Sequence, residues 1–156
     1  MIKITLLYAF WAAAAGALIP VMAAMNGRLG KTIGNIPYSV LILFTLAVVG
    51  AAVFVLVSKA PFPTSAQLSS ASPIDFSGGL IVLFYVISAT FLAPRFGVAN
   101  TIFFVVVAQI IAATAIDHYG LFSTEVRALS LKRSIGIMLL IAGLIMARAT
   151  PNSSDT

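Results

Sequence analysis

Four long stretches of this chain contain no charged side chain, and this feature limits what the chain can fold into. The stretches cover residues 4–25, 38–58, 76–93 and 96–116. A helix needs about 20 apolar residues to cross the hydrocarbon core of a bilayer, and each stretch is close to that length. Only 8% of the 156 residues are charged, whereas a soluble domain has about 25%. The composition therefore excludes a water-soluble domain and a disordered chain.

A fifth span is expected at residues 131–149, although its charge-free part is short. Residues 134–147 carry no charge, and as a helix they extend only about 21 Å, less than a core of about 30 Å. The span is long enough if Lys132, Arg133 and Arg148 reach the headgroups with their charged ends. Residues 61–75, rich in Ser, Ala and Pro, predict a loop. We therefore expect an all-α integral membrane protein with one five-helix domain at residues 1–150 and a polar tail at 151–156.

The first stretch has a second interpretation, because Lys3 and the small residues 12–17 also fit a secretory signal peptide. Its apolar part is longer than the usual signal sequence core, so a transmembrane helix is the preferred interpretation. The first, second, fourth and fifth expected helices also carry a face of small residues, which in lipid marks close helix contacts. On the first helix this face comprises Ala9, Ala12, Ala13, Gly16, Pro20 and Ala23.

The charge pattern argues against several function classes. The net charge is +5, but the basic residues are scattered singly between apolar stretches rather than gathered as in a nucleic-acid-binding domain. The chain has no cysteine and one histidine, so we expect no metal site and no cofactor. Catalytic motifs such as GxSxG and HExxH do not occur. We expect neither an enzyme nor a nucleic-acid partner.

Polar and amphipathic side chains within the spans are the candidate site residues. Trp11, Tyr85, Ser88 and Gln109 lie deep in three of the expected helices. Such groups either bond between helices or line a cavity for a small molecule. The four acids lie outside the middle of every span, which disfavours a lipophilic cation relative to a neutral, zwitterionic or anionic solute.

Asp117 and His118 are adjacent at the end of the fourth stretch. A carboxylate beside an imidazole can tune proton binding near neutral pH, so the pair is a candidate for coupling or gating. The alternative is a polar helix end that anchors at the headgroups. Both interpretations remain open from the residues alone.

The basic residues are almost evenly divided between the two sides of the membrane. One side carries five of them (Lys3, Lys59, Arg127, Lys132 and Arg133) and the other carries four (Arg28, Lys31, Arg95 and Arg148). Because lysine and arginine in short loops set orientation, this balance predicts insertion both ways round. Two copies can then pair antiparallel into ten helices with the solute path between them.

Several motifs resemble the YdcZ-like branch of the drug/metabolite transporter superfamily. They are GALIP at 16–20, NGRL at 26–29, Gly78 with Gly79, YV at 85–86, APRFG at 93–97, QIIA at 109–112, DHYGLF at 117–122, and Gly136 with Gly143. Their order and spacing cover almost the whole chain. Where the family often has Gln two residues after the first-helix Pro, this chain has Met22.

The resemblance implies a multi-pass protein of the bacterial inner membrane that forms half of a ten-helix transporter. It adds Asn26 to the substrate-path candidates by similarity and supports Tyr85, Gln109, Asp117 and His118. The expected function is secondary transport, most simply export, of a small metabolite or drug by an antiparallel homodimer. A pair with a paralogous five-helix chain is one alternative. A non-transporting subunit that stabilises a membrane partner is the other.

Overall fold

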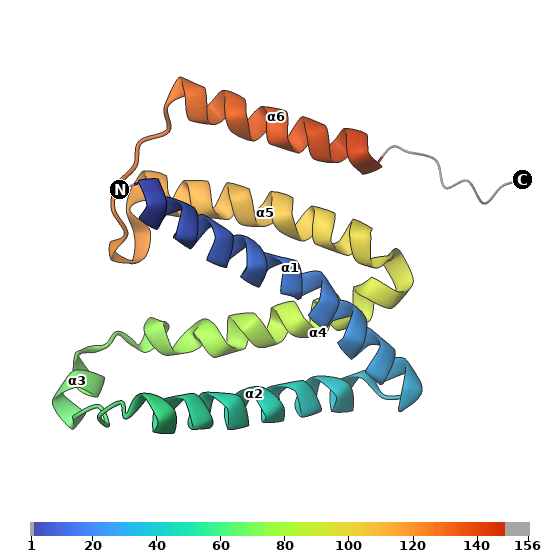
Figure 1. Ribbon diagram of the computed structural model, residues 1–156, viewed down its shortest axis with the longest axis vertical. Helices are drawn as coiled ribbons and strands as arrows, with labels where there is room; N and C mark the ends of the chain where they lie inside the picture. The colour runs from blue at the N-terminus through green and yellow to red at the C-terminus, as the bar shows by residue number, and fades with distance from the viewer. Residues whose placement is uncertain (1, 149–156) are drawn as a thin grey trace, which may run out of the picture. The chain divides into compact units, whose positions relative to one another are not determined.

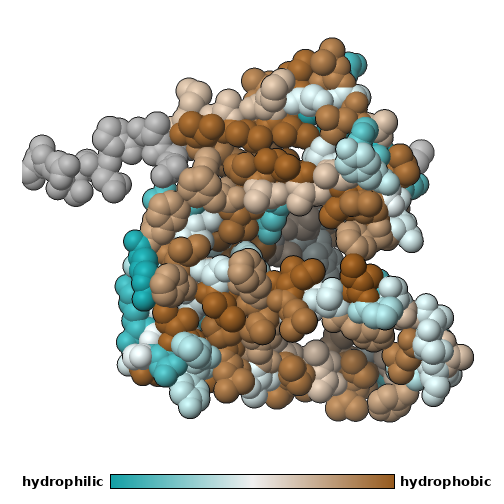
Figure 2. Space-filling view, turned by 180° about the vertical axis from the view of Figure 1, so that it is seen from behind, coloured by the Kyte–Doolittle hydropathy of each residue, from teal (hydrophilic) through white to brown (hydrophobic). Residues whose placement is uncertain are grey.

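Every element in the described part of the chain is helical. The computed structural model describes residues 2–148, and side chains for residues 4–146. Its elements are α1 (Ile2–Thr32), α2 (Ile36–Ser58), the short α3 (Ser65–Ser70), η1 (Pro73–Ser77), α4 (Gly78–Phe96), α5 (Val98–Tyr119), η2 (Leu121–Ser123) and α6 (Leu131–Arg148) (Figure 1). Hydrophobic side chains cover the length of the helices, and hydrophilic ones gather at their ends (Figure 2).

Four of the described helical segments are long and apolar enough to cross a membrane, namely Ile4–Thr32, Ile36–Ser58, Pro73–Phe96 and Val98–Tyr119. They correspond to the first four expected spans, and the chain is an integral membrane protein. The helix expected to form the fifth span is present as α6, with 18 residues. It is not among the four, so a fifth crossing stays a prediction.

Two boundaries differ from the sequence expectation. Helix α1 continues to Thr32, beyond the expected end at residue 25, because Asn26 and Gly27 are buried against neighbouring helices and do not end the helix. The expected loop at 61–75 contains α3, which begins with a capping box. In this box Thr64 Oγ1 accepts from the Gln67 amide, and Gln67 Oε1 accepts from the Thr64 amide at 2.8 Å. The loop prediction missed this reciprocal pair.

The chain divides into two compact units, residues 1–98 and 99–156. In the first unit, α1 packs against both α2 and α4, and α2 also contacts α4. The buried core consists of Ala23, Ala89 and Ala93, with Tyr85 and Val98 packed against it. Small side chains at this core let the helix backbones approach closely, which is how helices associate in lipid.

Two glycines on α1 set the distance to its neighbours. A Cβ atom on Gly27 would lie 3.3 Å from Pro94 Cδ of α4, and one on Gly30 would lie 3.1 Å from Ser39 Oγ of α2. Both positions are buried. A Cβ atom at either position would require the neighbouring side chain to shift by a few tenths of an ångström. The chain then turns at Gly34, whose φ of +67° favours glycine, and α2 begins where the Asn35 side chain accepts from the Tyr38 amide at 3.2 Å.

The N-terminal half of α1 is uncovered. Residues 4–18 are all exposed, Trp11 is 74% exposed, and no atom lies within 4 Å of a Cβ placed on Gly16. Of the small-residue face expected on this helix, Ala23 is the member that the first unit buries against α4. The other helices of the first unit leave the rest of that face exposed as far as Gly16.

In the second unit, the loop between α5 and α6 folds back onto the end of α5. Gly120, Phe122 and Ser123 all have positive φ, which reverses the chain direction immediately after the helix. The Arg127 amide then donates to the Asp117 carbonyl oxygen at 2.8 Å. This arrangement brings the start of α6 near the end of α5.

Candidate functional site

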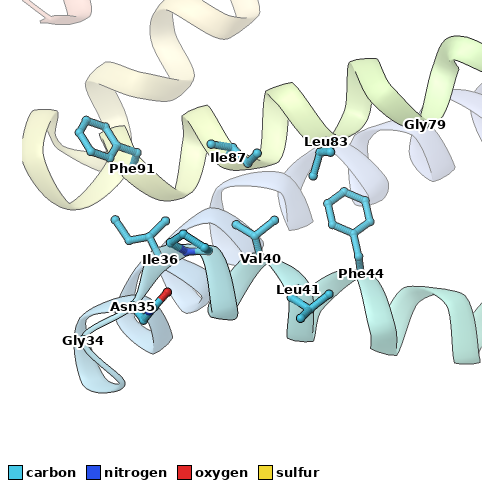
Figure 3. Close-up of a pocket in the computed structure, with 11 residues that line it drawn as sticks. Gly34, Asn35, Ile36, Val40, Leu41, Phe44, Gly79, Leu83, Ile87 and Phe91 are labelled. Atoms are coloured by element: carbon cyan, nitrogen blue, oxygen red, sulfur yellow. The ribbon is translucent and has the colours of Figure 1, made fainter.

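A large apolar groove lies between α2 and α4. Its volume is about 950 Å³, which is within the usual range for a small-molecule site. Helix α4 contributes residues spaced by four, so that they form one stripe along the helix. That stripe is Gly79, Leu83, Ile87 and Phe91, and it faces Val40, Leu41 and Phe44 of α2 (Figure 3). Asn35 supplies a polar side chain at the end of the groove beside the α1–α2 turn.

A second cavity of about 620 Å³ lies between α1 and α2. It is lined mostly by Leu, Met, Val and Ile side chains, together with Asn26, Arg28 and Thr32. Thr32 Oγ1 donates to the Arg28 carbonyl oxygen at 3.0 Å. This cavity therefore combines an apolar wall with a cation and an amide near the end of α1.

Asn26 forms a buried hydrogen bond between two helices. Its Nδ2 donates to Thr90 Oγ1 of α4 at 2.6 Å, and the residues are 5% and 0% exposed. The sequence proposed Asn26 as a solute-path residue by family similarity. The structure shows that its amide is used in packing α1 against α4, although the residue also borders the α1–α2 cavity.

Tyr85 packs on the same face of α4 as the buried core. Its hydroxyl is buried and has no hydrogen-bond partner among the described residues. Leaving such a group unpaired costs about 1–3 kcal/mol. Tyr85 is not among the residues that line the α2–α4 groove or the α1–α2 cavity.

The remaining candidates within the spans do not form a cluster with Tyr85 inside the first unit. Ser88 Oγ donates to the Phe84 carbonyl oxygen of its own helix at 2.8 Å, and Trp11 is exposed on the uncovered half of α1. Gln109 is exposed on α5, in the second unit. A shared cavity of Trp11, Tyr85, Ser88 and Gln109 therefore stays a prediction.

Asp117 and His118 are both tied to the segment that follows α5. Asp117 Oδ2 pairs with Arg133 Nη2 of α6 at 2.6 Å, and both side chains are about one-third exposed. His118 Nδ1 accepts a hydrogen bond from the Leu129 amide at 3.1 Å. Neither partner was anticipated from the sequence, because residues 11 and 16 positions apart meet only when the loop folds back.

A second ion pair in this loop lies farther from the helix ends. Arg127 Nη2 contacts Glu125 Oε2 at 3.0 Å, and both side chains are mostly exposed. The hydrogen bond and the charge of Glu125 raise the pKa of Arg127 above its usual value. Exposed pairs contribute little to stability, so the Asp117 and His118 contacts are the more informative ones.

The described acids lie near helix ends or in loops. Asp75 Oδ2 accepts from the Ser72 amide at 2.9 Å just before α4, Asp117 is near the end of α5, and Glu125 is in the following loop. The described residues also contain no group of three His, Cys, Asp or Glu side chains that could hold a metal ion. The apolar grooves, with few polar groups, suit binding or passage of a solute.

The helices and their surface define an integral membrane protein that crosses the bilayer several times. A family model described as "Putative inner membrane exporter, YdcZ" matches residues 7–146. The chain belongs to this family, which confirms the resemblance found in its motifs. The description of this family is that of a transporter, a class of protein that moves its solute without changing it. Neither the curated proteins nor the solved structures that were compared with the chain give a significant match.

We predict that Thr90→Val destabilises the fold by about 1 kcal/mol. Valine keeps the volume of threonine but leaves the buried Asn26 amide without its acceptor, and interhelical hydrogen bonds in membranes are of this size. Thermal unfolding of the detergent-solubilised protein measures the loss. Thr45→Val is the matched control, because Thr45 is exposed and bonds only to the Leu41 carbonyl oxygen of its own helix. Equal losses of thermal stability in Thr90→Val and Thr45→Val would contradict a stabilising hydrogen bond between Asn26 and Thr90.

Proposed function

We propose that the chain is a secondary transporter that exports a small solute across the inner membrane of a bacterium. The observation that carries this proposal is the family match, which spans residues 7–146. The large groove between α2 and α4 and the unpartnered hydroxyl of Tyr85 support it. They supply apolar space and a polar contact on helices that cross the bilayer.

The working unit that we propose is an antiparallel homodimer of five-helix chains. In this proposal residues 1–150 form the domain, α6 is the fifth span, and 151–156 are a polar tail. The uncovered half of α1, with Trp11 and Gly16 exposed, offers a surface for the second copy. The near-even distribution of basic residues supports insertion in both orientations.

The solute that we propose is neutral, zwitterionic or anionic. A lipophilic cation in a membrane site is usually balanced by a carboxylate, and the described carboxylates lie near helix ends or in loops. Candidate contacts along the path are Trp11, Asn26, Tyr85, Ser88 and Gln109. Of these, Tyr85 is singled out because its buried hydroxyl has no hydrogen-bond partner among the described residues.

Coupling to protons is assigned in this proposal to His118, with Asp117 as its neighbour. The His118 Nδ1 atom accepts the Leu129 amide hydrogen, and it can do so only while it carries no proton. A second proton on the ring breaks this bond and loosens the loop at 120–130. The titratable or charged groups around the same turn are Asp117, Tyr119, Glu125, Arg127, Lys132 and Arg133.

The alternative function is a membrane subunit that stabilises a partner without transporting anything. A paralogous five-helix chain is the alternative partner within transport. The exposed half of α1 suits both alternatives. A transport measurement separates the non-transporting subunit from the proposed exporter. The same measurement on the isolated chain separates a pair with a paralogous chain from a homodimer.

We predict that Tyr85→Phe slows export at least about fivefold, because a lost hydrogen bond of about 1 kcal/mol in the transition state changes a rate by that factor. Everted vesicles containing the chain would be screened with labelled amino acids, small carboxylic acids and sugars, and the accumulated solute would then be used with the variant. Tyr8→Phe is the control, since Tyr8 is 69% exposed on the uncovered half of α1. Unchanged export by Tyr85→Phe would assign its hydroxyl to packing.

We predict that the C-terminus is found on both sides of the membrane. Two fusions would carry a reporter active only in the cytoplasm or only in the periplasm, and both should be active. Adding two lysines to the loop at 61–75 should then shift the population toward one orientation. Activity of one reporter alone, in every variant, would exclude the antiparallel homodimer.

We predict that His118→Gln weakens the pH dependence of export. In the wild type, protonation of Nδ1 on acidification of the side that carries the α5–α6 loop would break the bond to Leu129 and should change the rate severalfold. A glutamine oxygen accepts the same amide at every pH. The assay is flux into proteoliposomes under an imposed pH gradient. An unaltered pH profile in the variant would exclude His118 as the coupling group.

A further inference from the structure

Two cavities of different character meet at the α1–α2 turn. The large groove between α2 and α4 is apolar along its length. A smaller cavity of about 340 Å³ is lined by Lys31 and Arg95 together with Gly27, Gly30 and Pro94. Gly34 and Ile36 line both cavities. The apolar groove between α2 and α4 therefore ends beside the two cationic side chains of Lys31 and Arg95.

The Arg95 side chain folds back toward the groove. Its Nη1 donates to the Phe91 carbonyl oxygen at 2.9 Å, and its Cζ lies 3.7 Å from the centre of the Phe91 ring. Phe91 itself lines the groove (Figure 3). A guanidinium has five N–H donors, so most of them remain for an anion at this end.

These cations have no carboxylate partner in the described part of the chain. The two described ion pairs involve Arg127 and Arg133, both in the second unit. The single acid of the first unit, Asp75, precedes the opposite end of α4, and twenty helical residues separate positions by about 30 Å. The charge at Lys31 and Arg95 is therefore not balanced within this unit.

The length of the groove matches one leaflet of a bilayer. On α4 the lining runs from Gly79 to Phe91, and this span of a helix extends about 18 Å. Half of a hydrocarbon core of about 30 Å is about 15 Å. On α2 the lining runs from Ile36 to Phe44, about 12 Å, and on α4 it reaches Gly79, the second residue of the helix. The groove is therefore long enough to hold one acyl chain that starts from the charged end of the helices.

We propose that the α2–α4 groove binds an acyl chain of an anionic phospholipid of the bilayer, with its phosphate beside Lys31 and Arg95. Basic pockets between membrane helices are known to hold such headgroups. Arginine binds phosphate through two parallel hydrogen bonds. Leu83, Ile87 and Phe44 provide the apolar contact for the chain. This lipid site does not require that the protein be a transporter. In the proposed exporter, the lipid would cover the groove in the state without solute.

The test measures which lipid the full-length protein retains. The chain is reconstituted with equal amounts of phosphatidylglycerol and phosphatidylcholine that carry the same acyl chains. It is then extracted in mild detergent, and bound lipid is counted by native mass spectrometry. The wild type should favour phosphatidylglycerol by about thirtyfold, because two basic residues near an anionic headgroup contribute about 1 kcal/mol each and each step of about 1.4 kcal/mol is a factor of ten. The variant with both Lys31→Gln and Arg95→Gln should bind the two lipids almost equally.

Matched controls separate charge, groove and fold. Lys59→Gln removes a cation that follows the other end of α2, and it should leave the preference unchanged. Leu83→Trp fills the groove and should reduce retention of both lipids, whereas Leu80→Trp, on the same helix but outside the groove lining, should not. The double variant Lys31→Arg and Arg95→Lys should keep the preference. Circular dichroism and size-exclusion profiles verify that each variant is folded.

Three results would overturn the proposal. Equal binding of the two lipids by the wild type excludes an anionic headgroup site. Displacement of the lipid by glycerol phosphate at the same concentration indicates a site for a free anion. The chain has no cysteine, so Leu83→Cys introduces a unique thiol. Efficient disulfide linkage of two Leu83→Cys chains in the membrane would mean that a second copy covers the groove.

Discussion

The close approach of α1 to its two neighbours determines the rest of the first unit. In a bilayer, an apolar side chain gains no hydrophobic free energy by moving from lipid into contact with another helix, because lipid tails are equally apolar. Helices therefore associate where their backbones can come close together. Gly27 against Pro94 and Gly30 against Ser39 provide that approach. It brings the Asn26 amide to within 2.6 Å of Thr90, and it places Lys31 beside Arg95 at the end of α4. Because α1 occupies the small-residue face of α4, the larger side chains at Leu83, Ile87 and Phe91 face α2 across an open groove.

The second unit relies on a different kind of interaction. Its helices are joined by a loop that reverses at three residues with positive φ and returns to the last turn of α5. Asp117 and His118 then contact Arg133 and the Leu129 amide. These are polar contacts at a helix end, and the side chains of Asp117 and Arg133 are about one-third exposed. The first unit is held instead by close approach of helix backbones at glycines.

The exposed surface of the single chain is consistent with a part of a larger assembly. Trp11 and the small residues near it lie on a half-helix that nothing in the first unit covers. Lipid can cover such a surface, and so can a second copy. If α6 is a fifth span, as we propose, an odd number of spans cannot be divided into two equal inverted halves, and pairing between chains would supply the symmetry of larger transporters. The lipid proposed for the groove would occupy a different surface from that contact.

The sequence predicted the positions of the membrane helices, because these depend only on the length and the charge of each stretch. Four charge-free stretches predicted four membrane helices to within a few residues, except that α1 continues to Thr32. Short motifs in order identified the family that residues 7–146 match. Asn26 was named as a path residue, but its use against Thr90, 64 positions away, could not be foreseen. The same holds for Arg133 as the partner of Asp117. Hydrophobicity is summed along one helix and needs no knowledge of its neighbours, whereas a hydrogen bond or groove exists only after two helix faces have been brought together. That pairing of faces was decided by the tertiary structure, through glycines that let the backbones approach.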